Sequence, residues 1–137
     1  PPGPTSAGTI SKGNWWSTEA ATEAEVQAVE KSGKRVDIAL THDGPVRPPG
    51  QPLWRDPLDP TLADDLERQT RYIRRVASAW RPQHLWHGHH HQRFDHTINL
   101  DGGHRLRITA LAAENLATGP LCVDLAEMDL PPLDERP

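Results

Sequence analysis

Two short strand-like segments with a helical pattern between them constrain the fold of this chain more than any other feature. The segments are residues 36–40 and 84–87, and each runs into a loop that contains glycine and histidine. Strand, helix, strand is the order of a crossover unit, in which two parallel strands pair and a helix joins them. The sequence therefore predicts a mixed α/β fold in which these two segments are neighbouring strands.

Helix signals lie on either side of the first strand. Thr22 followed by Glu25 fits a capping box, and Gly33 fits a helix end, so a helix is predicted between them. A second helix is predicted to begin with Asp59 as the N-cap and Pro60 as the first helical residue. Its apolar face would consist of residues at helical spacing, which are Leu62, Leu66, Ile73, Val76, Ala77 and Trp80.

The last third of the chain has the pattern of an antiparallel hairpin. Apolar and polar residues alternate over 97–100 and 105–108, on either side of Asp101-Gly102-Gly103. Residues 121–125 resemble a closing strand, and the proline-rich residues 46–58 are predicted to form a long loop or flap. The predicted sheet is therefore mixed, with an antiparallel hairpin in its carboxyl-terminal part.

Length and composition limit the class of protein. The 137 residues suit one domain over 1–137, with residues 1–13 and 127–137 as loose ends. The net charge of −4 does not favour nucleic-acid binding, which usually needs a basic face. The single cysteine, Cys122, excludes an internal disulfide, and no apolar stretch approaches the ~18 residues of a membrane span. Neither a nucleic acid nor a membrane is expected as a partner, and the expected location is the cytoplasm.

Histidines gather where the second strand ends. Gly88 is followed by His89, His90 and His91. If this segment is extended, His89 and His91 project to the same side, and neutral imidazole is the commonest metal ligand among side chains. A solvated polar run that is rich in histidine is the alternative. The apolar approach to Gly88, a residue that permits a sharp turn, favours the metal site.

The first strand also ends at a histidine, His42. Because the carboxyl ends of parallel strands meet at one edge of a sheet, His42, His89 and His91 are predicted to converge as metal ligands. Asp43 would either hold His42 by a hydrogen bond or serve as an N-cap or turn residue. The ring of His90 is predicted to point away from the metal. The alternative is that it contacts the substrate.

Two further predictions concern residues outside the metal ligands. Trp54, in the proline-rich loop, would border a substrate pocket, an interface or the core that it covers. His84 and His87 are predicted to be strand residues that are packed or half exposed.

The histidine motifs resemble those of a known family. Thr41-His42-Asp43-Gly44-Pro45 after a strand resembles the Thr-His-Asp-x-Pro segment of calcineurin-like metallophosphoesterases, and 88–91 resembles that family's terminal Gly-His-x-His motif. The resemblance covers roughly residues 8–126. It implies an αββα two-sheet sandwich with a two-metal centre at one sheet edge. By this resemblance His42 and His89 would bind one metal and His91 the other.

The same resemblance implies the chemistry. Two divalent ions (manganese, iron or zinc) would lower the pKa of a bound water and hold the phosphoryl oxygens during hydrolysis of a phosphate mono- or diester. The chain departs from the family in lacking its Asp-x-His, Gly-Asp and Gly-Asn-His motifs. Those motifs supply the bridging carboxylate, most ligands of the second metal and the acid for the leaving group.

Three interpretations of the whole chain follow. In the first, the chain is the carboxyl-terminal part of a phosphoesterase, inactive alone, which binds its missing amino-terminal half, binds a partner chain or self-associates. In the second, it is a non-catalytic or remnant module that binds one structural metal or a partner protein. In the third, it is an interaction domain that uses Trp54 and the proline-rich loops.

Overall fold

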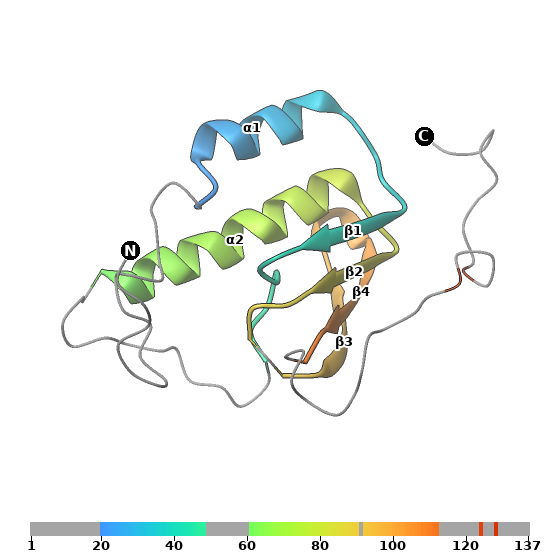
Figure 1. The fold of residues 1–137 in the computed structure, drawn as a ribbon. Coiled ribbons are helices and arrows are strands. Elements are labelled where there is room, and N and C mark those ends of the chain that lie inside the picture. The colour runs from blue at the N-terminus through green and yellow to red at the C-terminus, as the bar shows by residue number, and fades with distance from the viewer. Residues whose placement is uncertain (1–19, 49–60, 91, 113–123, 125–127, 129–137) are drawn as a thin grey trace.

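The computed structural model describes residues 20–48, 61–90, 92–112, 124 and 128. Their elements are α1 (Glu23–Ser32), β1 (Ile38–Thr41), α2 (Leu62–Trp80), β2 (His84–His87), β3 (Phe94–Asn99), the 3₁₀ turn η3 (Asp101–Gly103) and β4 (Arg105–Ala110). The four strands form one mixed sheet in the order β1-β2-β4-β3. Figure 1 shows α2 running alongside the sheet, with α1 packed on α2.

The capping box at the start of α1 is confirmed. Thr22 Oγ1 accepts a hydrogen bond from the backbone N–H of Glu25 (3.3 Å), and the Glu25 carboxylate accepts one from the N–H of Thr22 (2.8 Å). Gly33 closes the helix with φ +63°, a conformation that glycine adopts without a Cβ penalty. Val26 is the buried residue of this helix, and α1 therefore rests on the rest of the fold through a narrow apolar stripe.

Helix α2 begins later than its sequence signals predict. Its N-cap is Thr61 rather than Asp59, because the first intrahelical hydrogen bond runs from the N–H of Asp65 to the carbonyl of Thr61. Asp59 and Pro60 lie outside the described residues. At the other end the helix stops after Trp80, where Arg81 takes a left-handed conformation (φ +54°) and Pro82, which cannot continue a helix, follows.

The apolar face of α2 packs on the sheet. Ala77 is buried in the core, and Ile73 and Trp80 pack against that core. A second buried surface of α2 faces the chain before α1, where the buried Gln69 accepts a hydrogen bond from the N–H of Ala21 (3.0 Å) and donates one to its carbonyl (3.2 Å). A buried amide with both groups paired costs little, and it fixes the approach to α1.

The predicted parallel pairing of the first two strands is confirmed. Ile38 pairs with His84, and the register continues to Thr41 opposite His87. The first strand is shifted toward the carboxyl end relative to the predicted residues 36–40. The reason is that Val36 and Asp37 bond to the chain that connects α2 and β2, through the carbonyl of Trp80 and the N–H of Gln83.

The predicted hairpin is also confirmed, as the antiparallel strands β3 and β4. The second strand of the hairpin, not the first, pairs with β2, in parallel. Its residues Leu106, Ile108 and Ala110 are fully buried, whereas β3 is largely exposed. The hairpin strand with the fully buried face thus takes a central position, where both of its edges are paired.

Some predicted features fall on residues that are not described. Of residues 121–125 only Asp124 is described, and it lies in no strand. The proposed loose ends at 1–13 and 127–137, apart from Met128, are outside the described residues, as are residues 49–58 of the proline-rich loop. Within the described residues there is one sheet rather than two. Neither described helix has the length and apolar character needed to span a bilayer.

Candidate metal centre

The loops that follow β1 and β2 lie together at one edge of the sheet. We call residues 42–48 the β1 loop and residues 88–90 the β2 loop. Thr41 and His87 are the last paired residues of the two strands, and one residue further the N–H of Gly88 donates to the carbonyl of His42 (3.1 Å). This hydrogen bond extends the strand pairing into the loops. It brings side chains that are 47 positions apart in sequence to one place.

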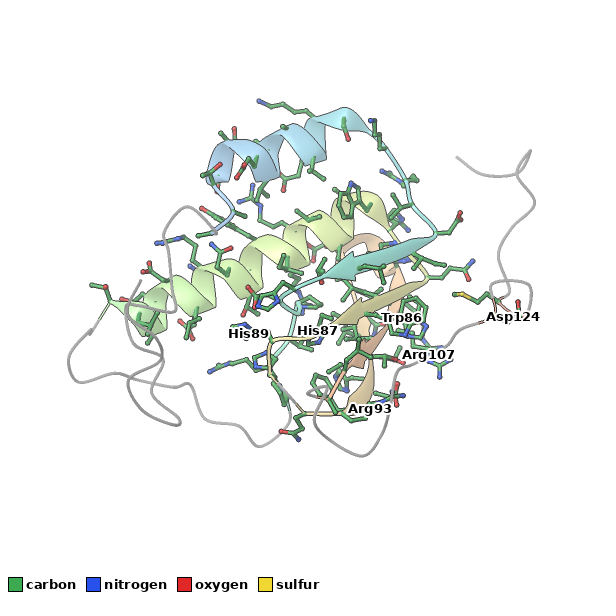
Figure 2. All side chains as sticks on the ribbon, viewed as in Figure 1. Trp86, His87, His89, Arg93, Arg107 and Asp124 are labelled. Carbon is green, nitrogen blue, oxygen red and sulfur yellow. The ribbon has the colours of Figure 1, made fainter. Side chains whose placement is uncertain are left out.

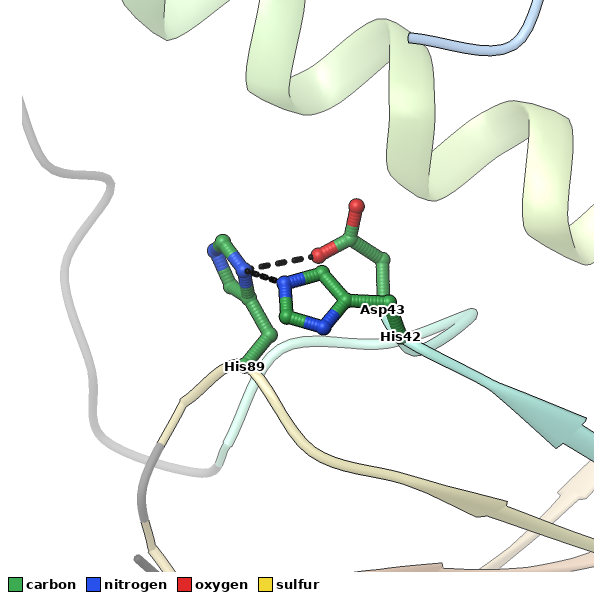
Figure 3. Close-up of side chains that lie close together, drawn as sticks. All are labelled: His42, Asp43 and His89. Atoms are coloured by element: carbon green, nitrogen blue, oxygen red, sulfur yellow. Dashed lines mark hydrogen bonds and ion pairs between the residues drawn. The ribbon is translucent and has the colours of Figure 1, made fainter. Parts of the chain in front are cut away.

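Three side chains at this edge point toward one another (Figure 3). His89 Nδ1 lies 3.1 Å from His42 Nε2 and 3.0 Å from Asp43 Oδ1. One donor atom from each of the three residues lies within 4.8 Å of the others. Around a tetrahedral zinc ion with bonds of about 2.0–2.1 Å, ligand atoms are roughly 3.3 Å apart. The donor set and its spacing therefore fit a single divalent ion.

The backbone of the β2 loop corrects one prediction. His89 has φ +62°, and the N–H of His90 donates to the carbonyl of Gly88 (2.7 Å), which closes a tight γ-turn. The segment is therefore not extended at His89, and the argument that His89 and His91 project to one side of a strand was wrong. The turn instead aims His89 back toward the β1 loop. His91 lies outside the described residues.

A left-handed backbone at histidine carries a cost. Such conformations of non-glycine residues typically cost about 1–3 kcal/mol and gather at functional sites. Here the γ-turn is held by its own hydrogen bond, and the imidazole of His89 is held by Asp43. The strain at His89 is thus associated with the convergence of the three side chains.

His87 supports the site from behind. Its side chain is 1% exposed, and a Cβ atom on Gly44 would lie 2.5 Å from Cε1 and Nε2 of its ring. Glycine at position 44 therefore lets the β1 loop rest directly on the imidazole. Thr41 Oγ1 donates to the carbonyl of Asp43 (2.6 Å) and fixes the same loop from the other side.

His87 is a packed strand residue, as predicted, but its contact with Gly44 was not predicted. The Nδ1–H of His87 donates to the carbonyl of Gly88 (3.1 Å), so Nε2 carries the lone pair. Among the described side chains, Nε2 is a buried nitrogen without a hydrogen-bond partner. Gly44, directly after Thr41-His42-Asp43, is a sequence signal that another group packs closely on the backbone there. The sequence does not show that this group is the ring of His87.

The charges of the site are coupled. Burial raises the pKa of Asp43, but the hydrogen bond with His89 and the neighbouring histidines outweigh it and lower the pKa below its ordinary value. The same hydrogen bond is the main reason that the pKa of His89 is raised. Near neutral pH, Asp43 is therefore a carboxylate, a good ligand for a divalent cation. With 23% and 24% of the Asp43 and His89 side chains exposed, solvent screens this pair only in part.

His90 is a neighbour of the three residues and not one of them. Its ring lies edge-on to those of His87 and His89, with centroids 5.9 Å and 5.1 Å away. Burial is the main cause that lowers the pKa of His90 to about 4, so the ring is neutral at pH 7. Trp54, the other substrate candidate, lies outside the described residues.

A second polar cluster lies along the sheet, away from the metal centre. His84 Nε2 donates to Thr109 Oγ1 (2.8 Å), and that hydroxyl donates to Asp95 Oδ1 (2.6 Å). His84 also stacks on Trp86, with ring centroids 3.6 Å apart. Figure 2 shows Trp86 and Arg107 in this region, and His87 and His89 toward the other end of β2. A chain of hydrogen bonds between neighbouring strands is the pattern of a structural network.

Comparison with protein-family models, with curated proteins and with solved structures found no match to this chain. The metallophosphoesterase resemblance therefore rests on the motif residues alone and stays a prediction.

Proposed function

We propose that this chain supplies the histidine side of a metal-dependent phosphoesterase centre that hydrolyses phosphate mono- or diesters. His42 and His89 would hold one divalent ion (manganese, iron or zinc), and His91 would hold a second. The observation that carries the proposal is the 3.1 Å separation of His42 Nε2 and His89 Nδ1, contributed by two loops at the carboxyl edge of a parallel strand pair. That edge is where α/β sheets bind ligands.

The residues of this chain would have distinct roles. His42 and His89 bind, the γ-turn at His89 orients its imidazole, and the buried ring of His87 keeps water from the rear of the site. His90, neutral at pH 7, would face the substrate as a hydrogen-bonding group. When bound, the metal ions lower the pKa of a water molecule and neutralise charge on the phosphoryl oxygens.

The rest of the centre must come from elsewhere. The bridging carboxylate and the leaving-group acid would be supplied by an amino-terminal half or a partner chain, which completes the αββα sandwich. Leu40 supports such an addition: it is 77% exposed on β1, which lies at the edge of the described sheet. A large apolar side chain on an edge strand marks a surface that gains stability when another segment covers it. With one cysteine in 137 residues, the proposed setting is the cytoplasm.

The test combines metal binding with hydrolysis. The chain is purified without chelators, and metal content, affinity and oligomeric state are compared with those of His89→Ala. Hydrolysis of p-nitrophenyl phosphate and bis(p-nitrophenyl) phosphate is measured for the chain alone and with any copurifying partner. The proposal predicts metal binding that the substitution abolishes, with activity and a second ion only in the complex. Metal content that is unchanged in His89→Ala would refute it.

A second candidate is a non-catalytic module that binds one metal ion. The observation that favours it is the group formed by His42, Asp43 and His89, which offers three donor atoms without any other chain. This candidate predicts one tightly bound ion per chain, a higher melting temperature with metal, and no hydrolysis in any complex.

A further inference from the structure

We propose that Asp43 is a direct metal ligand, so that His42, Asp43 and His89 together form a three-ligand site for one divalent ion within this chain. The inference rests on the proposed binding of metal by His42 and His89 and extends it. It replaces the supporting role predicted for Asp43 by coordination. It also makes the first ion independent of His91 and of any missing half.

Asp43 faces the ring nitrogen of His89 that also lies next to His42. A carboxylate that only orients a metal-bound histidine binds the ring nitrogen that is not on the metal. Asp43 Oδ1 instead lies 3.0 Å from His89 Nδ1, and this same nitrogen lies 3.1 Å from His42 Nε2. The three donor atoms thus lie close enough together to bind one ion.

The two loops have little freedom to separate these atoms. The β1 loop rests on the buried ring of His87 through Gly44. The hydrogen bonds from Gly88 N to the His42 carbonyl and from Thr41 Oγ1 to the Asp43 carbonyl hold both ends of the His42-Asp43 pair. Preorganised ligands lose less conformational entropy when an ion binds. The separations of 3.0 and 3.1 Å from His89 Nδ1 are within a few tenths of an ångström of the roughly 3.3 Å expected between ligand atoms around a zinc ion.

The composition of the site indicates which ions it takes. Two imidazoles and one carboxylate are the ligand set of many catalytic zinc sites and of non-haem iron sites, which keep at least one coordination position open. His42 is exposed, while Asp43 and His89 are half-buried. Three ligands on one side and solvent on the other leave such a position open to water or to a phosphate oxygen.

Cobalt(II) is a suitable probe because its visible spectrum reports coordination. The full-length chain is titrated with cobalt as wild type, Asp43→Asn, His42→Ala, His89→Ala and His91→Ala. Asparagine keeps the size and the hydrogen-bond acceptor of Asp43 but is a poor ligand. Asp101→Asn is the matched control, because Asp101 is an exposed carboxylate in the turn between β3 and β4. Circular dichroism confirms that each variant folds.

We expect cobalt affinity to fall at least about 100-fold in Asp43→Asn, beyond the range typical of a supporting residue, with a changed visible spectrum. Asp101→Asn and His91→Ala should leave the first ion unaffected. A gain of signal gives an independent test: Asp43→Cys, in a Cys122→Ser background, should produce an intense thiolate-to-cobalt charge-transfer band.

The possible outcomes separate the inference from the proposed function. A charge-transfer band in Asp43→Cys supports direct ligation. Its absence overturns the inference, and so does an Asp43→Asn variant with wild-type spectrum and affinity. Either result leaves the proposed function standing when His42→Ala and His89→Ala still abolish binding. If those two variants bind cobalt as tightly as the wild type, both proposals fail.

Discussion

The contact between Gly44 and His87 gives a quantitative prediction for Gly44→Ala. The new Cβ would lie 2.5 Å from two ring atoms of His87, whereas comfortable contacts between heavy atoms are about 3.5–4.0 Å. The loop or the ring must therefore move by about 1 Å. The ring is 1% exposed, so it is enclosed by other parts of the protein. Overpacking of this kind typically costs about 1–3 kcal/mol, which we expect as the loss in the free energy of unfolding.

Urea denaturation measures this loss, and a double-mutant cycle assigns it. In a His87→Ala background the ring is gone, so Gly44→Ala should cost almost nothing, and the coupling energy should equal about 1–3 kcal/mol. Gly88→Ala is the matched control, because a Cβ there meets no atom within 4 Å. Gly44→Ala should also weaken cobalt binding, since it moves His42 and Asp43 away from His89.

Two results would refute this reasoning. One is a Gly44→Ala variant whose stability lies within ~0.5 kcal/mol of the wild type, the range of an ordinary surface substitution. The other is an equal loss in the wild-type and His87→Ala backgrounds, which would place the cost somewhere other than in the ring contact.

The helix cap, the buried His84 and the metal centre each give one further test. Thr22→Ala removes the hydroxyl that accepts a hydrogen bond from the N–H of Glu25, so it should lower the free energy of unfolding by about 1 kcal/mol. Thr22→Ser keeps a hydroxyl at this position and should keep the stability. Thermal unfolding of the two variants tests this. Burial and, next, the charge of Arg107 lower the pKa of His84 below 6.5, so the folded state favours the neutral ring. The neutral ring of His84 therefore contributes to the free energy of unfolding above pH 6.5, and this contribution is lost as the pH falls below 6.5. Urea denaturation at pH 7.5 and at pH 5 should show a smaller change in the free energy of unfolding between the two pH values for His84→Gln than for the wild type. Finally, zinc at about 100 times its dissociation constant should stabilise the chain by about 2.7 kcal/mol, and a chelator should remove this gain. An equal response in His89→Ala would contradict metal binding at this site.

Local signals predicted most of the individual elements. The Thr22–Glu25 capping box and the hairpin around Gly102 and Gly103 both depend on residues close in sequence. Such signals lie within a few residues of one another, so they can be recognised without knowledge of the rest of the fold. The start of α2 was misplaced because Asp59-Pro60 and Thr61 offer competing N-caps, and only the hydrogen bond from Asp65 N distinguishes them.

Strand order was decided by burial. The sequence indicated a hairpin but not which of its strands would lie next to β2. The fully buried Leu106, Ile108 and Ala110 make β4 the strand with most to gain from a central position. Strand β3 carries polar side chains, which can stay exposed to solvent at the edge of the sheet.

What the sequence by itself determined is the set of parts: two helices, two parallel strands, a hairpin, and histidines placed where strands end. The meeting of His42 with His89 followed from it, because parallel neighbouring strands must end at one edge. The tertiary structure alone decided the left-handed turn at His89, the contact of Gly44 with the buried His87, and the nitrogen that Asp43 faces. Each of these depends on distances between atoms far apart in the chain, and such distances are set by packing rather than by local propensity.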